Sequence, residues 1–109
     1  MAEYASDILF SIDTALQLKN GLNAETITTP KVLTYQDSTF QALKNVTGSL
    51  DVTLPSPKSG CNFWIKSRAS STSNIVVKDH NAATVQTLAA GNSVLVACDD
   101  SAWYNIVVG

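Results

Sequence analysis

The chain has 109 residues, 45% of them hydrophobic and 15% charged, and its formal net charge is −2. Arg68 is the only arginine, so the chain lacks the basic surface that neutralises a phosphate backbone, and we expect no nucleic-acid partner. No apolar stretch approaches the roughly 20 residues that cross a bilayer, and Glu3 and Asp7 stand where a secretory signal carries Lys or Arg. We therefore expect one small domain, made in the cytoplasm, with no membrane-spanning segment.

The first 30 residues carry two competing patterns. In one, Ser6 begins a helix and Asn20-Gly21 ends it. The apolar face of this helix holds Ile8, Leu9, Ile12, Ala15 and Leu16. In the other, alternate residues of the same stretch are apolar, as in a strand, and Asn20-Gly21 is a hairpin turn. We expect strands or an extended arm at residues 1–30, ahead of a β domain at residues 31–109.

Short β-rich runs follow, separated by turn residues. Residues 31–35 and 40–46 favour strands on either side of the turn Gln36-Asp37-Ser38. Residues 50–54 alternate apolar and polar, which predicts a strand buried on one face. Two of the chain's three prolines then end this run.

The last part of the chain repeats this pattern. Residues 61–66 alternate so that Trp64 stands on the face opposite the buried residues. Further strands are predicted at 75–78, 85–88, 93–98 and 103–108. The turn at 89–92 predicts that the two strands flanking it form a hairpin-like pair. We expect the last strand to be tied into a sheet, with Val107 or its neighbours buried.

Composition and strand spacing together indicate a mainly β fold. Ser and Thr account for 23 of the residues, a neutral polar content that favours strands and turns over helices with Glu–Lys pairs. We predict a small antiparallel β-sandwich or barrel, jelly-roll-like in its connections. Because the core of so short a chain is small, we expect oligomerisation to add stability.

The chain offers few residues for catalysis. His80 is the only histidine, and we expect it in an exposed turn rather than in a catalytic or metal site. Cys61 and Cys98 are predicted to be buried free thiols, although a disulfide is sterically allowed if their strands are neighbours. Asp79 and the pair Asp99-Asp100 are the best carboxylates for a cation, and we expect them to bind backbone amides in turns. We therefore predict no enzyme activity, no metal site and no cofactor.

A series of short motifs runs from residue 40 to the C-terminal residue. Its members are Gln41–Gly48, Val52–Gly60, Phe63–Lys66, Ser73–Asp79, Thr87–Ser93 and Cys98–Tyr104. In this order they resemble modules of tailed-phage structural proteins, namely tail-fibre and capsid-decoration domains. The chain departs from the pattern at Asn81-Ala82 and at Asp100, where a turn glycine is expected.

The resemblance implies a non-enzymatic virion protein that works by binding other protein surfaces. Modules of this kind are similar in being compact β-sandwiches or barrels, often trimeric, that attach to the virion through an N-terminal segment. For this chain the resemblance implies that residues 1–30 are a docking segment. The candidate interface residues are Tyr4, Ile8, Leu9, Phe10 and Trp64.

We accordingly predict a capsid decoration protein, located on the capsid surface of the virion after synthesis in the host cytoplasm. Its expected partners are the major capsid protein and further copies of itself, with a trimer favoured. It would stabilise the shell through contacts that bridge shell subunits. The alternative is a tail-fibre or receptor- or carbohydrate-binding module, with Trp103 and Tyr104 as an aromatic platform. A small hydrolase or metal-dependent enzyme is the third hypothesis, opposed by the single histidine.

Overall fold

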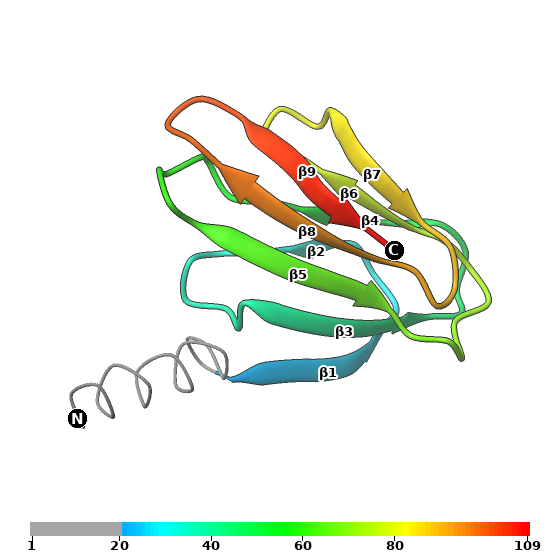
Figure 1. Ribbon diagram of the computed structural model, residues 1–109. Coiled ribbons are helices and arrows are strands. Elements are labelled where there is room, and N and C mark those ends of the chain that lie inside the picture. The colour runs from blue at the N-terminus through cyan, green and yellow to red at the C-terminus, as the bar shows by residue number, and fades with distance from the viewer. Residues whose placement is uncertain (1–20) are drawn as a thin grey trace, which may run out of the picture.

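Two β-sheets packed face to face make up the part of the chain that the structure describes. The computed structural model describes residues 21–109, and within this range it contains nine strands and no helix. The strands are β1 Leu22–Ile27, β2 Lys31–Val32, β3 Phe40–Asn45, β4 Leu50–Thr53, β5 Asn62–Ser67, β6 Ile75–Lys78, β7 Thr84–Leu88, β8 Ser93–Cys98 and β9 Trp103–Val108. The five-stranded sheet has the order β1-β3-β5-β8-β9, and the four-stranded sheet behind it in Figure 1 has the order β2-β4-β6-β7.

The first six strands wind like three coils of a β-solenoid. Strands β1, β3 and β5 pair in parallel in the five-stranded sheet, and β2, β4 and β6 pair in parallel in the four-stranded sheet. The chain therefore crosses to the other sheet after each strand and returns one position further along. Leu22, Phe40 and Trp64 are neighbours in this register, each contributed by a different coil. Each coil depends on the next one for its hydrogen bonds, as in repeat proteins.

The last three strands reverse direction and close the fold. Strand β7 is antiparallel to β6, β8 is antiparallel to β5, and β9 is antiparallel to β8. The connection from β7 to β8 leads from the four-stranded sheet to the five-stranded sheet. It contains Gly91, whose φ of 87° is disfavoured for residues with a Cβ. The Gly91 amide donates to the Ser67 carbonyl at 2.9 Å, which holds this connection against the end of β5. Parallel pairing therefore ends at β5 in the five-stranded sheet and at β6 in the four-stranded sheet.

One hydrophobic core fills the space between the sheets, because alternate residues of the strands point inward. In β8, for example, Val94 and Val96 are fully buried while the residue between them is only partly covered. The buried apolar residues are Ile27, Leu33, Leu43, Val52, Leu54, Phe63, Ile65, Ile75, Val77, Leu88, Val94, Val96, Cys98 and Trp103. Both sheets contribute, so the core stabilises the packing of one sheet on the other.

Asn45 ties the coils together at one end of the core, where its side chain is fully buried. Its Nδ2 donates to the Gly48 carbonyl at 2.7 Å and to the Asn74 carbonyl at 2.8 Å, and its Oδ1 accepts from the Thr47 amide at 3.1 Å. Its own amide donates to Ser71 Oγ at 3.0 Å. The Gly48, Thr47 and Asn74 groups belong to the connections between strands, so a buried side chain supplies hydrogen bonds that the sheets leave incomplete there.

The mainly β prediction is confirmed, and several of its details differ. Antiparallel pairing holds for the last strands, whereas β1 to β6 pair in parallel because every connection between them crosses to the other sheet. The predicted pair of residues 85–88 with 93–98 is wrong, since β7 and β8 lie in different sheets. The strand predicted at 31–35 shortens to β2, because the Thr34 amide donates to Asp37 Oδ2 at 2.8 Å in a turn.

The N-terminal segment predicted at residues 1–30 is only partly described. Residues 1–20 lie outside the described residues. From residue 21 onward the segment belongs to the β fold, because β1 pairs with β3 along its whole length, from Leu22 opposite Phe40 to Ile27 opposite Asn45. A docking role for the first 20 residues stays a prediction.

Candidate functional site

The C-terminal strand β9 is the most exposed strand of the five-stranded sheet. Trp103 is buried, but the five residues that follow it are all exposed. A strand covered on one face buries every second residue. Beyond Trp103, therefore, the described chain buries neither face of β9 completely. The large apolar side chains of this stretch are Tyr104, Ile106, Val107 and Val108, which are 49%, 57%, 50% and 50% exposed. We call residues 104–108 the β9 edge.

The β9 edge also has an open hydrogen-bonding side. Among the described strands, β9 pairs with β8 alone. Its other side approaches β7, where Asn105 Nδ2 donates to Gln86 Oε1 at 3.0 Å and to the Val85 carbonyl at 3.4 Å. Strand β9 contains no proline and no charged residue, the features that usually block pairing at a sheet edge. An extended segment of another chain can add to such an edge through backbone hydrogen bonds.

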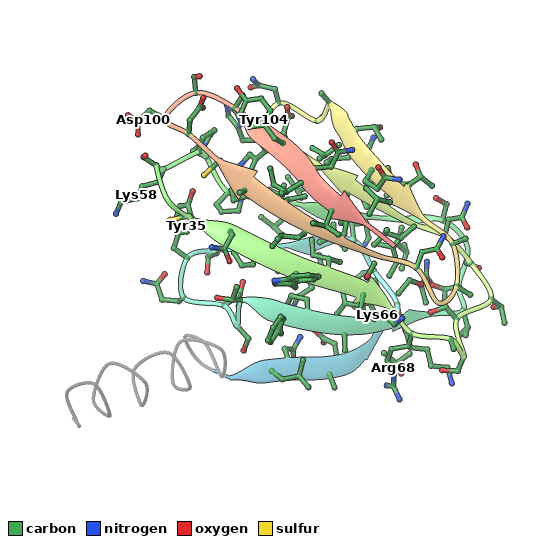
Figure 2. All side chains as sticks on the ribbon, in the orientation of Figure 1. Tyr35, Lys58, Lys66, Arg68, Asp100 and Tyr104 are labelled. Atoms are coloured by element: carbon green, nitrogen blue, oxygen red, sulfur yellow. The ribbon has the colours of Figure 1, made fainter. Side chains whose placement is uncertain are left out.

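The turn that leads into β9 is organised by Asp99. Its Oδ1 accepts from the amides of Ser101 and Ala102, both at 2.8 Å, and its Oδ2 accepts from the Tyr104 hydroxyl at 3.1 Å. The Ser101 and Ala102 amides lower the pKa of the Asp99 carboxyl, and the bond to Asp99 raises the pKa of Tyr104. The predicted turn role of Asp99 is confirmed. Figure 2 shows Tyr104 and Asp100 at the same end of the molecule.

The aromatic platform predicted from Trp103 and Tyr104 is wrong. Trp103 is only 7% exposed, and its ring lies in the core with its centroid 6.0 Å from that of Phe63. Its Nε1 donates to the Pro55 carbonyl at 2.8 Å, which satisfies the indole inside the fold. Because consecutive strand residues point to opposite faces, Tyr104 alone faces outward.

The opposite edge of the five-stranded sheet, β1, is protected. Glu25 stands opposite the buried Leu43 and so points toward the inner face. Its Oε2 accepts from Lys31 Nζ and from Asn23 Nδ2, both at 2.8 Å. The hydrogen bonds from Lys31 and then Asn23 lower the pKa of Glu25. An inward-pointing charge on an edge strand disfavours the addition of another strand, so β9 is the open edge of this sheet.

A row of apolar side chains crosses the outer face of the five-stranded sheet. Leu22, Phe40, Trp64, Leu95 and Val107 are successive neighbours in the register of its five strands, and we call them the apolar row. The Phe40 and Trp64 rings lie 6.1 Å apart between centroids, tilted by 58°. A shallow groove of about 210 Å³ lies beside these rings. The outer face carries a continuous apolar band as a result.

The predicted interface residues fall into two groups. Tyr4, Ile8, Leu9 and Phe10 lie outside the described residues. Trp64 stands in the apolar row, on the outer face that strand alternation predicts for it, and its side chain is half-buried by its neighbours. Its role in contacting a partner stays a prediction.

The β9 edge is a surface that the sequence analysis did not identify. The run Ile106-Val107-Val108 carries the signal, since it is apolar and free of charge. We expected Val107 or its neighbours to be buried, and this expectation is wrong. An apolar strand at a sheet edge and an apolar strand at a sheet centre have the same residue pattern, so only the strand order distinguishes them.

The residues that the sequence offered for catalysis or metal binding lie in turns or at the core. His80 is exposed in the turn before β7, and Asp79 Oδ1 accepts from two backbone amides of that turn at 2.8 and 2.9 Å. Cys61 and Cys98 are free thiols on neighbouring chain segments, with the Cys98 amide donating to the Cys61 carbonyl at 3.1 Å. Within residues 21–109, no three His, Cys, Asp or Glu side chains gather into a group that can hold a metal ion.

The fold and these surfaces define a small two-layer β protein, solenoid-like in its first six strands, with an open edge and an apolar outer face. No family model, curated protein or solved structure matches the chain. Across the described range, no helix is long and apolar enough to cross a membrane. Function is therefore argued from the surfaces themselves.

Proposed function

We propose that the chain is a capsid decoration protein of a tailed phage. It binds the outer surface of the head shell, through contacts with the major capsid protein, and stabilises the shell by bridging its subunits. It is made in the host cytoplasm, acts on the capsid surface of the virion, and works without catalysis or a cofactor. The observation that carries this proposal is the β9 edge, where five consecutive strand residues are exposed.

The β9 edge supports protein binding by strand addition. A segment of a shell subunit that pairs with β9 satisfies the open backbone groups of the strand and covers its apolar side chains. Ile106 and Val108 are 57% and 50% exposed, so burying the rest of each side chain contributes about 1 kcal/mol. A short strand contact of this kind is directional, because hydrogen bonds fix its register, and it needs neither a deep pocket nor a charged partner.

Shell stabilisation follows from the number of copies. Every bound subunit adds interface free energy to the closed shell, and that free energy must be lost before the shell opens. Copies that are linked to one another bind as a multivalent unit and dissociate more slowly than single copies. We therefore include self-association in the proposal, and the homotrimer favoured by the sequence stays a prediction.

The test mixes the purified full chain with emptied phage heads that lack it and images the mixture by cryo-electron microscopy. The decisive variant carries Ile106→Lys and Val108→Lys, because charged residues on an edge strand oppose strand addition. The matched control is Val32→Lys, which places the same charge on an exposed valine, 67% accessible, of the four-stranded sheet. Circular dichroism checks that each variant keeps the β fold.

We expect the unmodified chain and the Val32→Lys control to give density at symmetric shell positions, and the double variant to leave the shell bare. Equal binding by the double variant excludes the β9 edge as the contact. If the unmodified chain fails to bind heads and binds host cells or glycans instead, the tail-fibre or receptor-binding alternative replaces the capsid assignment.

A further inference from the structure

The outer face of the five-stranded sheet has a ridge beside a trough. The apolar row forms the ridge. A second row in register lies two residues away on four of these strands and consists of Ala24, Ala42, Lys66 and Ser93. We call it the trough row. The two rows are separated by about 6.6 Å, the rise of two strand residues. The groove beside Phe40 and Trp64 lies between them and is lined by members of both rows.

We infer that two copies of the chain associate through this face, with the ridge of each copy seated in the trough of the other. Consider a two-fold axis that lies in the interface, parallel to the two rows and midway between them. Rotation about this axis turns the second copy over and exchanges the positions of the two rows. Each ridge residue of β1, β3, β5 and β8 then faces the trough residue of its own strand in the other copy, so one rotation matches these four strands, as in an isologous dimer.

The side-chain sizes fit this exchange strand by strand. On β1 and β3, Leu22 faces Ala24 of the second copy and Phe40 faces Ala42. On β8, Leu95 faces Ser93 in the same way. Three large apolar side chains thus oppose three small ones, the combination that lets two sheets approach closely without voids.

The fourth pair is complementary in charge. On β5, Trp64 faces Lys66 of the second copy, and a lysine ammonium is attracted to the face of an indole ring. Lys66 Nζ already donates to the Gly91 carbonyl at 2.7 Å, which holds the charge at the rim of the trough. Figure 2 shows Lys66 at the end of β5. Neither row contains a carboxylate, and Lys66 is the only charged residue in the two rows.

The area of this face is close to what a dimer needs. Five strands about 4.8 Å apart and about 20 Å long give a flat footprint of roughly 480 Å². Side chains standing above the sheet enlarge the accessible area beyond this value. Standard interfaces bury about 600–1,000 Å² per partner. The flat footprint lies below that range, and the side chains bring the contact toward its lower end, so we expect a weak, reversible dimer.

The inference specifies the self-association that the proposed function includes, with two copies in place of the trimer that the sequence favours, and it does not depend on binding to the capsid. The apolar row and the trough row lie on the face of the sheet, whereas the strand-addition surface is the outer side of β9. Val107 belongs both to the apolar row and to the β9 edge, so the dimer covers its side chain. The backbone of β9 on the side away from β8 stays open, so the dimer presents two binding edges to two neighbouring shell subunits. Loss of dimerisation and loss of head binding are consequently separate results.

Sedimentation velocity of the full chain, at concentrations from about 1 to 200 µM, tests the inference. We expect a weak dimer with so small a footprint to dissociate within these concentrations. The decisive variant is Ala42→Arg, which fills the trough opposite Phe40 with a long cation. The matched control is Thr87→Arg, which places the same side chain on an exposed position of β7 in the other sheet. We expect a two-chain mass for the unmodified chain and the control, and a one-chain mass for Ala42→Arg.

A second pair of variants tests the charge contact. Lys66→Arg keeps a cation over the partner's ring and should leave the dissociation constant nearly unchanged. Lys66→Glu removes the attraction at two symmetric positions and should weaken the dimer about fivefold or more.

Three outcomes overturn the inference. They are a three-chain mass, a two-chain mass that Ala42→Arg leaves unchanged, and a one-chain mass at every concentration. The last result means that another occupant covers the apolar row, either the shell protein or the chain's first 20 residues.

Discussion

The coiled half of the molecule, β1 to β6, and the antiparallel part, β7 to β9, hold the connections between their strands in different ways. In the coiled half every strand pairs with a strand two elements away, and the connections are held by buried side chains such as Asn45 and Ser71. In the antiparallel part the turns are held locally, by Asp79 and Asp99 binding amides a few residues away. The connections of the coiled half thus depend on contacts between distant residues, and the turns of the antiparallel part on contacts between near ones.

Among the variants that test this comparison, replacement of Asn45 should lower the free energy of unfolding most. Asn45→Ala removes the buried donor to the Gly48 carbonyl and one of two donors to the Asn74 carbonyl, which keeps the Leu50 amide at 3.2 Å. We therefore expect the free energy of unfolding to fall by about 2–3 kcal/mol. Urea denaturation followed by circular dichroism measures the loss. Asp79→Ala, which removes a local acceptor in an exposed turn, should cost less. An equal loss for both variants would contradict the distinction between the two parts.

Trp103 anchors the antiparallel part to the core, and its replacement should have the next largest effect. Trp103→Phe keeps an aromatic ring beside Phe63 but removes the donor to the Pro55 carbonyl, so we expect a loss of about 1–2 kcal/mol. The urea midpoint is again the measurement. Tyr104→Phe changes the next, outward-facing residue of the same strand and should shift the midpoint little. Comparable shifts for both variants would show that Trp103 is not an anchor.

Ser67 and Ser71 make a matched pair at the end of the coils. Both are buried, but Ser67 Oγ has no hydrogen-bond partner, whereas Ser71 Oγ accepts from the Asn45 amide at 3.0 Å. Ser67→Ala should therefore stabilise the fold by about 1 kcal/mol, because the buried hydroxyl no longer has to be desolvated. Ser71→Ala should destabilise it. Thermal denaturation of the two variants gives the signs, and matching signs would contradict this account.

Acid pH should slightly lower the stability of both parts, because it protonates Glu25 in the coiled half and Asp99 in the antiparallel part. Hydrogen bonds lower the folded-state pKa of both carboxyls below their ordinary values of 4.5 for Glu25 and 3.8 for Asp99. A lowered folded pKa means that the stabilisation is present above the unfolded pKa and is lost as pH falls through the folded one. Asp99 is exposed and the Glu25 side chain is 38% exposed, so solvent screening keeps the effect small. The difference in urea midpoint between pH 6 and about pH 3 should shrink in Glu25→Gln and in Asp99→Asn; an unchanged difference excludes these two carboxyls.

Much of the secondary structure follows from the chain's local patterns. Alternation places Phe63 and Ile65 inward and Trp64 outward on β5, as the structure has them. The turn role of Asp99 also follows from the residue type, because its short carboxylate reaches amides two and three residues on. These features are local, and the physics that decides them acts over a few residues.

The candidate site was harder to foresee for the same reason. The apolar run Ile106 to Val108 suits a buried strand as well as an exposed one, and β9 is exposed because no described strand follows it in the sheet. The apolar row likewise requires the registers of five strands, and no pattern within one strand indicates that Phe40 stands beside Trp64. Parallel pairing between strands of different coils leaves no mark on local alternation.

The sequence by itself determined that the protein is mainly β, which residues of most strands face inward, and that Asp79 and Asp99 form turns, because side-chain alternation and short-range hydrogen bonds depend only on neighbouring residues. Only the tertiary structure decided that β1 to β6 coil in parallel, that β9 lies at an open edge, and that five apolar side chains align across one face. Strand order and register are set by packing between residues far apart in the chain, and hydrophobicity alone does not specify which strand stands at the edge.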